Sequence, residues 1–265
     1  MLDKIFATLA ACVHVRRFTA SRNDGFSSYQ NLPAEDYACA VNNLGAMVNL
    51  GLQEATQLRL QIVNLPPEDW LAKVGLSRLA FGQDIADRHT HVLLSVRDRC
   101  LLLVNGALRL GLPPRQCTPM TIGRLLRGSD LQAEVAESLR QLDRVVVAIE
   151  DARNRHSHRG EPRSIASHGP LRRMEECLVA FDQSHVLPAE SITRSLEDLC
   201  AELDTEHSST AKAVQQLSVA LVPRYLEQIN VLGGIAMPTN TEATRAEEVM
   251  DYFAGGPKPT WMASS

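Results

Sequence analysis

The chain has 265 residues, of which 45% are hydrophobic and 22% are charged, a composition typical of a soluble globular protein with a buried core. The formal net charge of -4 gives no overall attraction to nucleic acid or to an anionic membrane, so binding to a polyanion would need a local basic patch. The length allows one large domain or two small ones.

The first residues and the cysteines indicate a cytoplasmic protein. An apolar run opens the chain, but Asp3 interrupts the basic segment of a signal peptide and no clean cleavage site follows. No apolar stretch approaches the roughly 20 residues of a membrane span. The six cysteines include no CxxC pair and stand mostly among apolar neighbours. This pattern favours buried thiols in a reducing compartment over disulfides or zinc ligands.

Apolar residues recur at three- and four-residue steps along most of the chain, and this spacing predicts helices. The first helix follows a Ser- and Asn-rich loop and ends at Pro66, and the second ends at Gly111. The all-apolar stretch CLLLV in the second helix indicates a central position. In chain order, the predicted helices cover residues 34–64, 84–110, 129–149, 170–182 and 188–230.

Several residues mark the ends of the later helices. Ser129 and Asp130 can cap the third predicted helix at its start. Pro223 should kink or divide the last one, because proline lacks the N–H that a helix interior needs. Gly233 and Gly234 should end it.

The whole pattern predicts an all-α fold. No strand-like alternation occurs, and the β-branched run RVVVAIE lies inside a helical pattern. We expect a single helical-bundle domain with long helices over residues 1–237, followed by a short helix and a flexible, disordered tail over 238–265.

A basic segment follows the third predicted helix. It reads EDARNRHSHRGEP, with Arg153 and His158 five residues apart and Asn154 directly after the arginine. The pattern R-N-x-x-x-H resembles the R-x(4–6)-H signature of the HEPN superfamily, whose members are small α-helical bundles. In that family the motif lies near the end of one of the later helices, as it does in this prediction.

The resemblance extends beyond the motif. It is strongest over the motif-bearing core, residues 84–183, where RDRCLLLVNGALRLGLPP is similar to a subset of bacterial HEPN proteins. Arg97 and Asp98 also match charged positions that these proteins place near the site. A structural ion pair is an alternative explanation for such charged residues.

The resemblance implies a metal-independent endoribonuclease that acts as a homodimer and needs no cofactor. His158 would be the acid or base, because an imidazole titrates near neutral pH. Arg153 would hold the phosphate through its forked donors, and Asn154 would orient one of the two or the substrate. The ribose 2′-OH would attack phosphorus and leave a 2′,3′-cyclic phosphate. The other basic residues of the segment would contact the RNA: Arg155, Arg159 and Arg163.

Family analogy also suggests a toxin or effector of a bacterial defence or toxin–antitoxin system, with an antitoxin or regulatory protein as a further partner. A rival function is that of a catalytically silent HEPN-like module, which would bind a nucleotide, RNA or a partner protein. The presence of both Arg153 and His158 favours the enzyme.

Helix geometry leaves the choice of histidine open. Positions five apart on a continuous helix point about 140° away from each other, so Arg153 shares a face with His156, the second candidate. The helix must end or loosen before His158 if the family's register holds. Gly160 and Pro162 favour an end nearby.

Other interpretations use the same residue types. Cations at a helix end complement the helix dipole without any catalytic role. A metal site would use His156, His158 and His168, but their spacing is poor and no carboxylate or cysteine completes the set, so we expect no metal. His89 and His91 are interpreted as ordinary core or boundary histidines. The motifs of phosphate-binding loops, dinucleotide folds and serine hydrolases do not occur.

Overall fold

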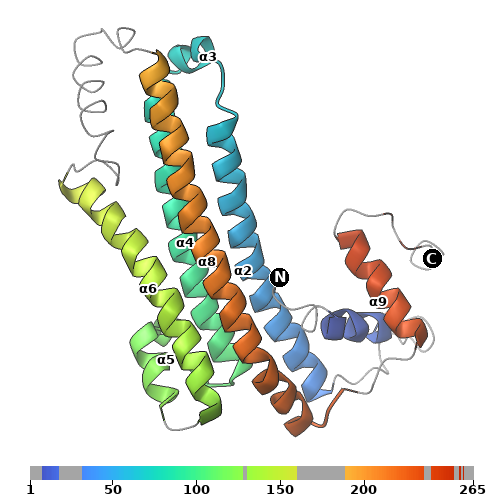
Figure 1. Ribbon diagram of the computed structural model, residues 1–265. Helices are drawn as coiled ribbons and strands as arrows, with labels where there is room; N and C mark the ends of the chain where they lie inside the picture. The colour runs from blue at the N-terminus through green and yellow to red at the C-terminus, as the bar shows by residue number, and fades with distance from the viewer. Residues whose placement is uncertain are drawn as a thin grey trace. The chain divides into compact units, whose positions relative to one another are not determined.

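The computed structural model describes residues 8–17, 32–127, 130–159, 189–235 and 240–253, together with 257 and 259. The elements within these ranges are helices, and no strand occurs among them, which confirms the predicted all-α fold (Figure 1). Residues 8–17 are helical. In chain order the further elements are α2 (Pro33–Val63), α3 (Glu68–Lys73), α4 (Arg78–Ala107), η1 (Pro114–Gln116), α5 (Pro119–Leu125), α6 (Asp130–Arg159), α8 (Ala189–Val231) and α9 (Asn240–Phe253).

The long helices agree with the apolar spacing, although some ends differ. α2 and α6 begin close to their predicted starts. α4 begins earlier than predicted, because Ser77 precedes it and its Oγ accepts a hydrogen bond from the N–H of Ala80 at 3.0 Å. The short helices α3 and α5 were not predicted. The helix predicted over 170–182 lies outside the described residues.

α8 continues through Pro223 without the division that proline could have imposed. Pro223 cannot donate to the carbonyl of Val219, but both residues are exposed, so water can satisfy that carbonyl. The predicted end of the helix is confirmed. Gly233 and Gly234 have φ angles of 101° and 72°, and the N–H of Gly234 donates to the Ile229 carbonyl at 2.8 Å.

The chain packs as two compact units, each built from separate stretches of sequence. The first unit comprises residues 1–49, 99–136 and 215–265, and the second unit comprises residues 50–98 and 137–214. The helices α2, α4, α6 and α8 each contribute one segment to either unit.

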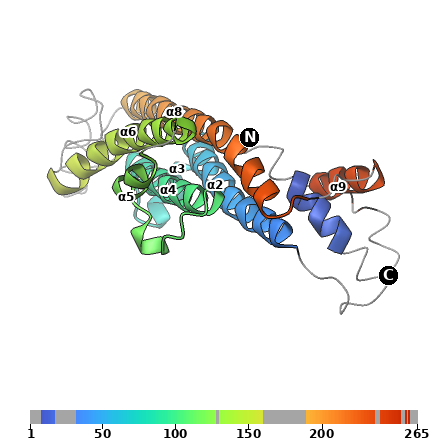
Figure 2. The same ribbon diagram turned by 90° about the horizontal axis from the view of Figure 1, so that it is seen from below.

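Within the first unit, the helix at residues 8–17 lies beside α9 (Figure 2). Their contact is a cluster of small and medium apolar residues: Ala11, Cys12, Val15, Ala246 and Val249. A second contact joins α2, α4 and α8. The hydroxyl of Tyr37 donates to the Ala107 carbonyl at 2.6 Å, and its ring lies 5.6 Å from the ring of the fully buried Tyr225.

Within the second unit, α2, α4 and α8 share an apolar core. Its buried members are Leu58, Ile62, Ile85, Ala86, Leu199 and Leu203. α6 is attached through Ile149, which packs against Ala55 of α2 and Leu93 of α4. α4 and α8 approach closely at Gly82, where a Cβ would lie 2.6 Å from a methyl carbon of Leu196. The second unit therefore positions α6, and with it the motif.

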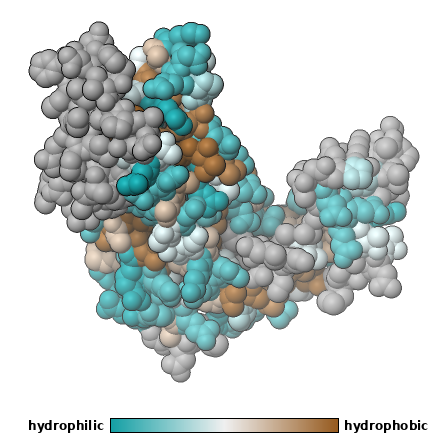
Figure 3. Space-filling view, turned by 45° about the horizontal axis from the view of Figure 1, so that its top comes forward, coloured by the Kyte–Doolittle hydropathy of each residue, from teal (hydrophilic) through white to brown (hydrophobic). Residues whose placement is uncertain are grey.

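The surface carries apolar as well as polar residues. Figure 3 shows hydrophobic residues scattered among hydrophilic ones on one face of the molecule. Such scattered apolar residues are normal for a folded protein. Among the described helices, none is long and apolar enough to cross a bilayer.

Candidate functional site

The predicted motif lies in the last two turns of α6. This helix begins at Asp130 and ends at Arg159, so it includes Arg153 and His158. The prediction that the motif stands at the C-terminal end of this helix is therefore confirmed. Arg163 lies outside the described residues.

The register of α6 separates Arg153 from His158. The buried face of the helix is marked by alternating steps of four and three residues: Val135, Leu139, Leu142, Val146 and Ile149. Position 153 is the next step of this stripe, and 156 follows it. Position 158 lies about 140° from 153 around the axis, because the backbone stays helical through 159. One copy of α6 thus places 153 beside 156 and away from 158.

The outer side of α6 carries the other motif positions. By the same register, positions 155 and 159 lie within about 100° of 158, and 154 lies within about 40° of it. Positions 154 and 155 therefore lie on the same side of α6 as 158, turned away from the buried stripe, whereas 159 lies between 158 and 156. Arg153 and His156 continue the stripe itself. The predicted catalytic and RNA-binding positions divide between two sides of one helix end.

Arg97 on α4 joins the motif helix through carboxylates. Its guanidinium lies 3.3 Å from Glu150 and 3.9 Å from Asp143, both on α6, and 3.3 Å from the neighbouring Asp98. The side chain of Arg97 is only 19% exposed. Glu150 precedes Arg153 by less than one helical turn. The charge of Arg97 is therefore balanced by its neighbours and attaches α4 to the motif end of α6.

The two residues after Arg97 point to different partners. Asp98 is mostly exposed and contacts only Arg97 among the described side chains. Arg99 donates to the Met47 carbonyl of α2 at 2.8 Å. Arg97 thus connects two helices through ion pairs, and Arg99 connects two helices through a bond to a backbone carbonyl.

A second group of polar side chains lies inside the second unit. His89 of α4 is fully buried, and neither of its ring nitrogens has a hydrogen-bond partner among the described residues. Its Nδ1 lies 3.7 Å from Oε2 of Glu206 on α8. The ring of His207 lies 6.4 Å from that of His89, between centroids. His89 is therefore a core histidine, as expected, and the half-buried ring of His207 lies beside it, which was not expected.

The hydrogen bonds of Thr56 fix the proton on His207. The Thr56 hydroxyl donates to the Leu52 carbonyl at 3.0 Å, so its oxygen is left to accept from Nε2–H of His207, 3.3 Å away. Nδ1 of His207 is buried and has no partner among the described residues. A second proton on this ring would have to go to that nitrogen. Burial, then the nearby His89 and Arg59, lower the pKa of His207 below its usual value.

This arrangement predicts that the fold weakens in acid. The unfolded chain protonates His207 near pH 6.5, and the folded chain does so only at lower pH, so the unfolded state binds more protons between the two values. The free energy of unfolding should therefore fall as the pH drops below about 6.5. Urea titrations at a series of pH values measure this slope.

His207→Gln should flatten that slope, because glutamine retains an N–H donor but does not titrate. His91→Gln is the matched control, since His91 is exposed on α4. Equal slopes for wild type and His207→Gln would contradict the assignment.

The described residues contain no group of three or more His, Cys, Asp or Glu side chains that could hold a metal ion. The side chains of His156 and His158, and the whole of His168, lie outside the described part of the chain. The alternative metal site built on them therefore stays a prediction.

Sequence reasoning missed the pairing of His207 with His89. A signal was present in α8, where the apolar stripe breaks between Leu203 and Val214 and polar residues occupy the inward steps. Thr210 is one of these, and it is fully buried. A polar interruption of a long apolar stripe is a sign of a buried polar layer.

Comparison with known proteins gave no match to a family model, to a curated protein or to a solved structure.

Proposed function

We propose that this protein is a metal-independent endoribonuclease of the HEPN type whose site is completed by a second copy of the chain. The proposal is supported by the position of the R-N-x-x-x-H sequence in the last two turns of a long helix in an all-α protein. The proposed substrate is RNA. By family analogy, the protein would act in the cytoplasm as a toxin or a defence effector.

The register of α6 favours a site made by two chains. In one copy, positions 153 and 158 lie on different sides of the helix, so a single α6 does not direct both into one cleft. A two-fold axis beside the helix end would bring Arg153 of one chain toward His158 of the other. The proposed homodimer follows from this requirement and from the family resemblance.

The chemistry of such a cleft needs no metal. An imidazole accepts the proton of the ribose 2′-OH, and the resulting oxygen forms a bond to phosphorus as the bond to the 5′ oxygen breaks. A protonated imidazole gives a proton to that leaving oxygen. The guanidinium of Arg153 stabilises the charge that gathers on the phosphorane. The products are a 2′,3′-cyclic phosphate and a free 5′-OH.

Purified protein should cut single-stranded RNA in the presence of EDTA and leave 2′,3′-cyclic phosphate ends. End-group analysis by mass spectrometry of the fragments measures this directly. Cleavage that stops with EDTA and returns with a divalent cation would refute the mechanism, because it would assign the proton transfer to a metal-bound water.

The silent binding module is the second candidate, and the same register is the observation that favours it. If α6 keeps one chain's Arg153 and His158 apart and no second copy joins it, the arginines of this segment still supply the local basic patch that binding to a polyanion needs. RNA binding without cleavage, by a protein that is monomeric in light scattering, would favour this module.

A further inference from the structure

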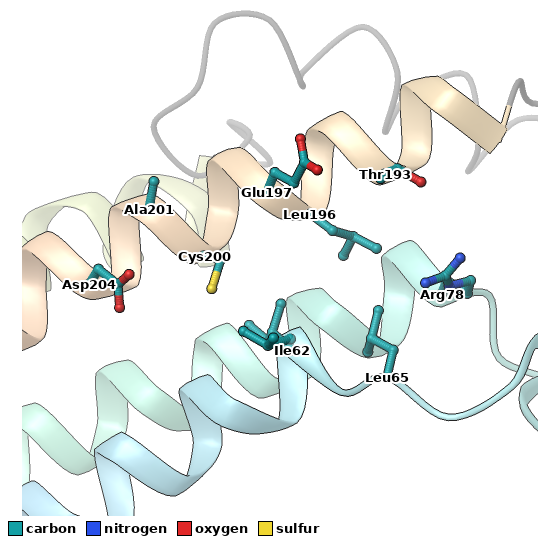
Figure 4. A pocket seen from close by; sticks show the side chains of 10 residues that line it. Ile62, Leu65, Arg78, Thr193, Leu196, Glu197, Cys200, Ala201 and Asp204 are labelled. Atoms are coloured by element: carbon teal, nitrogen blue, oxygen red, sulfur yellow. The ribbon is translucent and has the colours of Figure 1, made fainter.

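The second unit contains a pocket of about 460 Å³ that is separate from the motif positions (Figure 4). It lies where the end of α2, the start of α4 and the first turns of α8 meet. Its volume falls within the range of about 300–1,000 Å³ that is typical of small-molecule sites. On α8 the lining extends from Thr193 to Asp204, about 16 Å along the helix axis. The pocket is therefore elongated enough for a chain-like ligand.

The middle of the pocket is apolar. Ile62 and Leu65 point toward Leu196 and Cys200 across the space between α2 and α8 (Figure 4). Three of these are hydrocarbon side chains, and the fourth is a thiol that behaves as a small hydrophobe. A bound alkyl chain would remove this surface from water, with a gain of about 0.8 kcal/mol for each buried CH₂ group.

One end of the pocket carries the guanidinium of Arg78 (Figure 4). Arg78, the first residue of α4, lines the pocket and makes no ion pair with the described side chains. Its Nε is buried and has no hydrogen-bond partner there. A guanidinium offers forked donors that fit a carboxylate. An arginine that is half-buried beside an apolar surface and has no partner among the described residues points to an anionic group on an apolar ligand.

The carboxylates that line the pocket do not cancel this charge at the Arg78 end. Asp204 lies at the opposite end and forms an ion pair with Arg59. Glu197 belongs to the lining, but its carboxylate points away from Ile62 and Leu65 (Figure 4). The arrangement has a cation at one end, an apolar middle and a neutralised carboxylate at the other end.

We propose that this pocket binds a small amphipathic carboxylate, such as a medium-chain fatty acid. The carboxylate would lie on Arg78, and the alkyl chain would lie along Leu65, Leu196 and Cys200. This site is independent of RNA cleavage and of the α6 motif.

Decanoate is the probe for the first test. Isothermal titration should show saturable binding to the wild-type chain, and Arg78→Gln should weaken that binding at least about tenfold. Arg88→Gln is the matched control, because Arg88 is an exposed arginine of the same helix outside the lining. Decanol, which keeps the alkyl chain but lacks the carboxylate, should bind more weakly than decanoate. Equal affinity for the two, or equal affinity of wild type and Arg78→Gln, would overturn the proposal.

A second measurement locates the ligand without any variant. Cys200 lines the pocket, whereas Cys117 lies in the first unit and serves as an internal control. Burial, and then the nearby Asp204, raise the pKa of Cys200, so alkylation is followed in mildly alkaline buffer. Saturating decanoate should slow the alkylation of Cys200 and leave that of Cys117 unchanged in peptide mass spectra. An unchanged rate at Cys200 would place decanoate elsewhere and overturn the proposal.

Discussion

His158→Ala should lower RNA cleavage by about 10²–10⁴-fold, the usual contribution of a positioned acid or base. The fold should stay intact, because position 158 lies in the last turn of α6 and helix ends fray. Cleavage rates of wild type and variant on the same labelled RNA, with circular dichroism as the folding check, test this. If His156→Ala is the inactive variant and His158→Ala is active, then the shared face of positions 153 and 156 forms the site.

Arg153→Lys belongs to the same experiment and should also be severely impaired. Lysine keeps the charge but loses the forked donors, and the loss of one such stabilising group typically lowers the rate about 10²–10³-fold.

Two-chain assembly of the site is tested by mixing the inactive Arg153→Lys and His158→Ala proteins. A mixed dimer would still combine one intact arginine with one intact histidine, so part of the activity should return. A mixture that stays inactive while subunits exchange would contradict the two-chain cleft.

Leu93→Ala should destabilise the protein by about 2–5 kcal/mol. Leu93 is fully buried and packs against Ala55 of α2 and Ile149 of α6, so its removal leaves a cavity where α4 holds the motif helix. The midpoint of urea unfolding should fall accordingly. Leu60→Ala is the matched control, because Leu60 is 42% exposed on α2 and loses little packing. A Leu93→Ala protein as stable as the control would mean that this contact does not hold α6 in place.

Much of the fold could be predicted because the spacing of apolar residues is a local property. Val135, Leu139 and Leu142 repeat at helical steps, and this spacing alone predicted α6 and the position of the motif at its end. The residues that cap the helices were harder to predict. Ser77 extends α4 at its start through a single hydrogen bond to Ala80, a contact that the apolar pattern does not report.

The candidate site was harder to predict because its contacts join distant parts of the chain. Arg97 lies near Glu150 only once α4 and α6 have packed, and no local spacing connects the two. The same is true of His207 and His89, whose rings approach across two helices. Residue types and motifs predicted candidate positions for the site. The packing of the helices determines which of the described positions contact one another.

The two interleaved units set an order of assembly on the ribosome. The second unit needs residues 50–98 and 137–214, whereas the first unit also needs 215–265. During synthesis, all residues of the second unit are therefore made before residues 215–265 of the first unit. The second unit includes His89, most of α6 and the Arg78 pocket. We therefore expect residues 1–49 and 99–136 of a nascent chain to lack part of their packing partners until residues 215–265 have emerged.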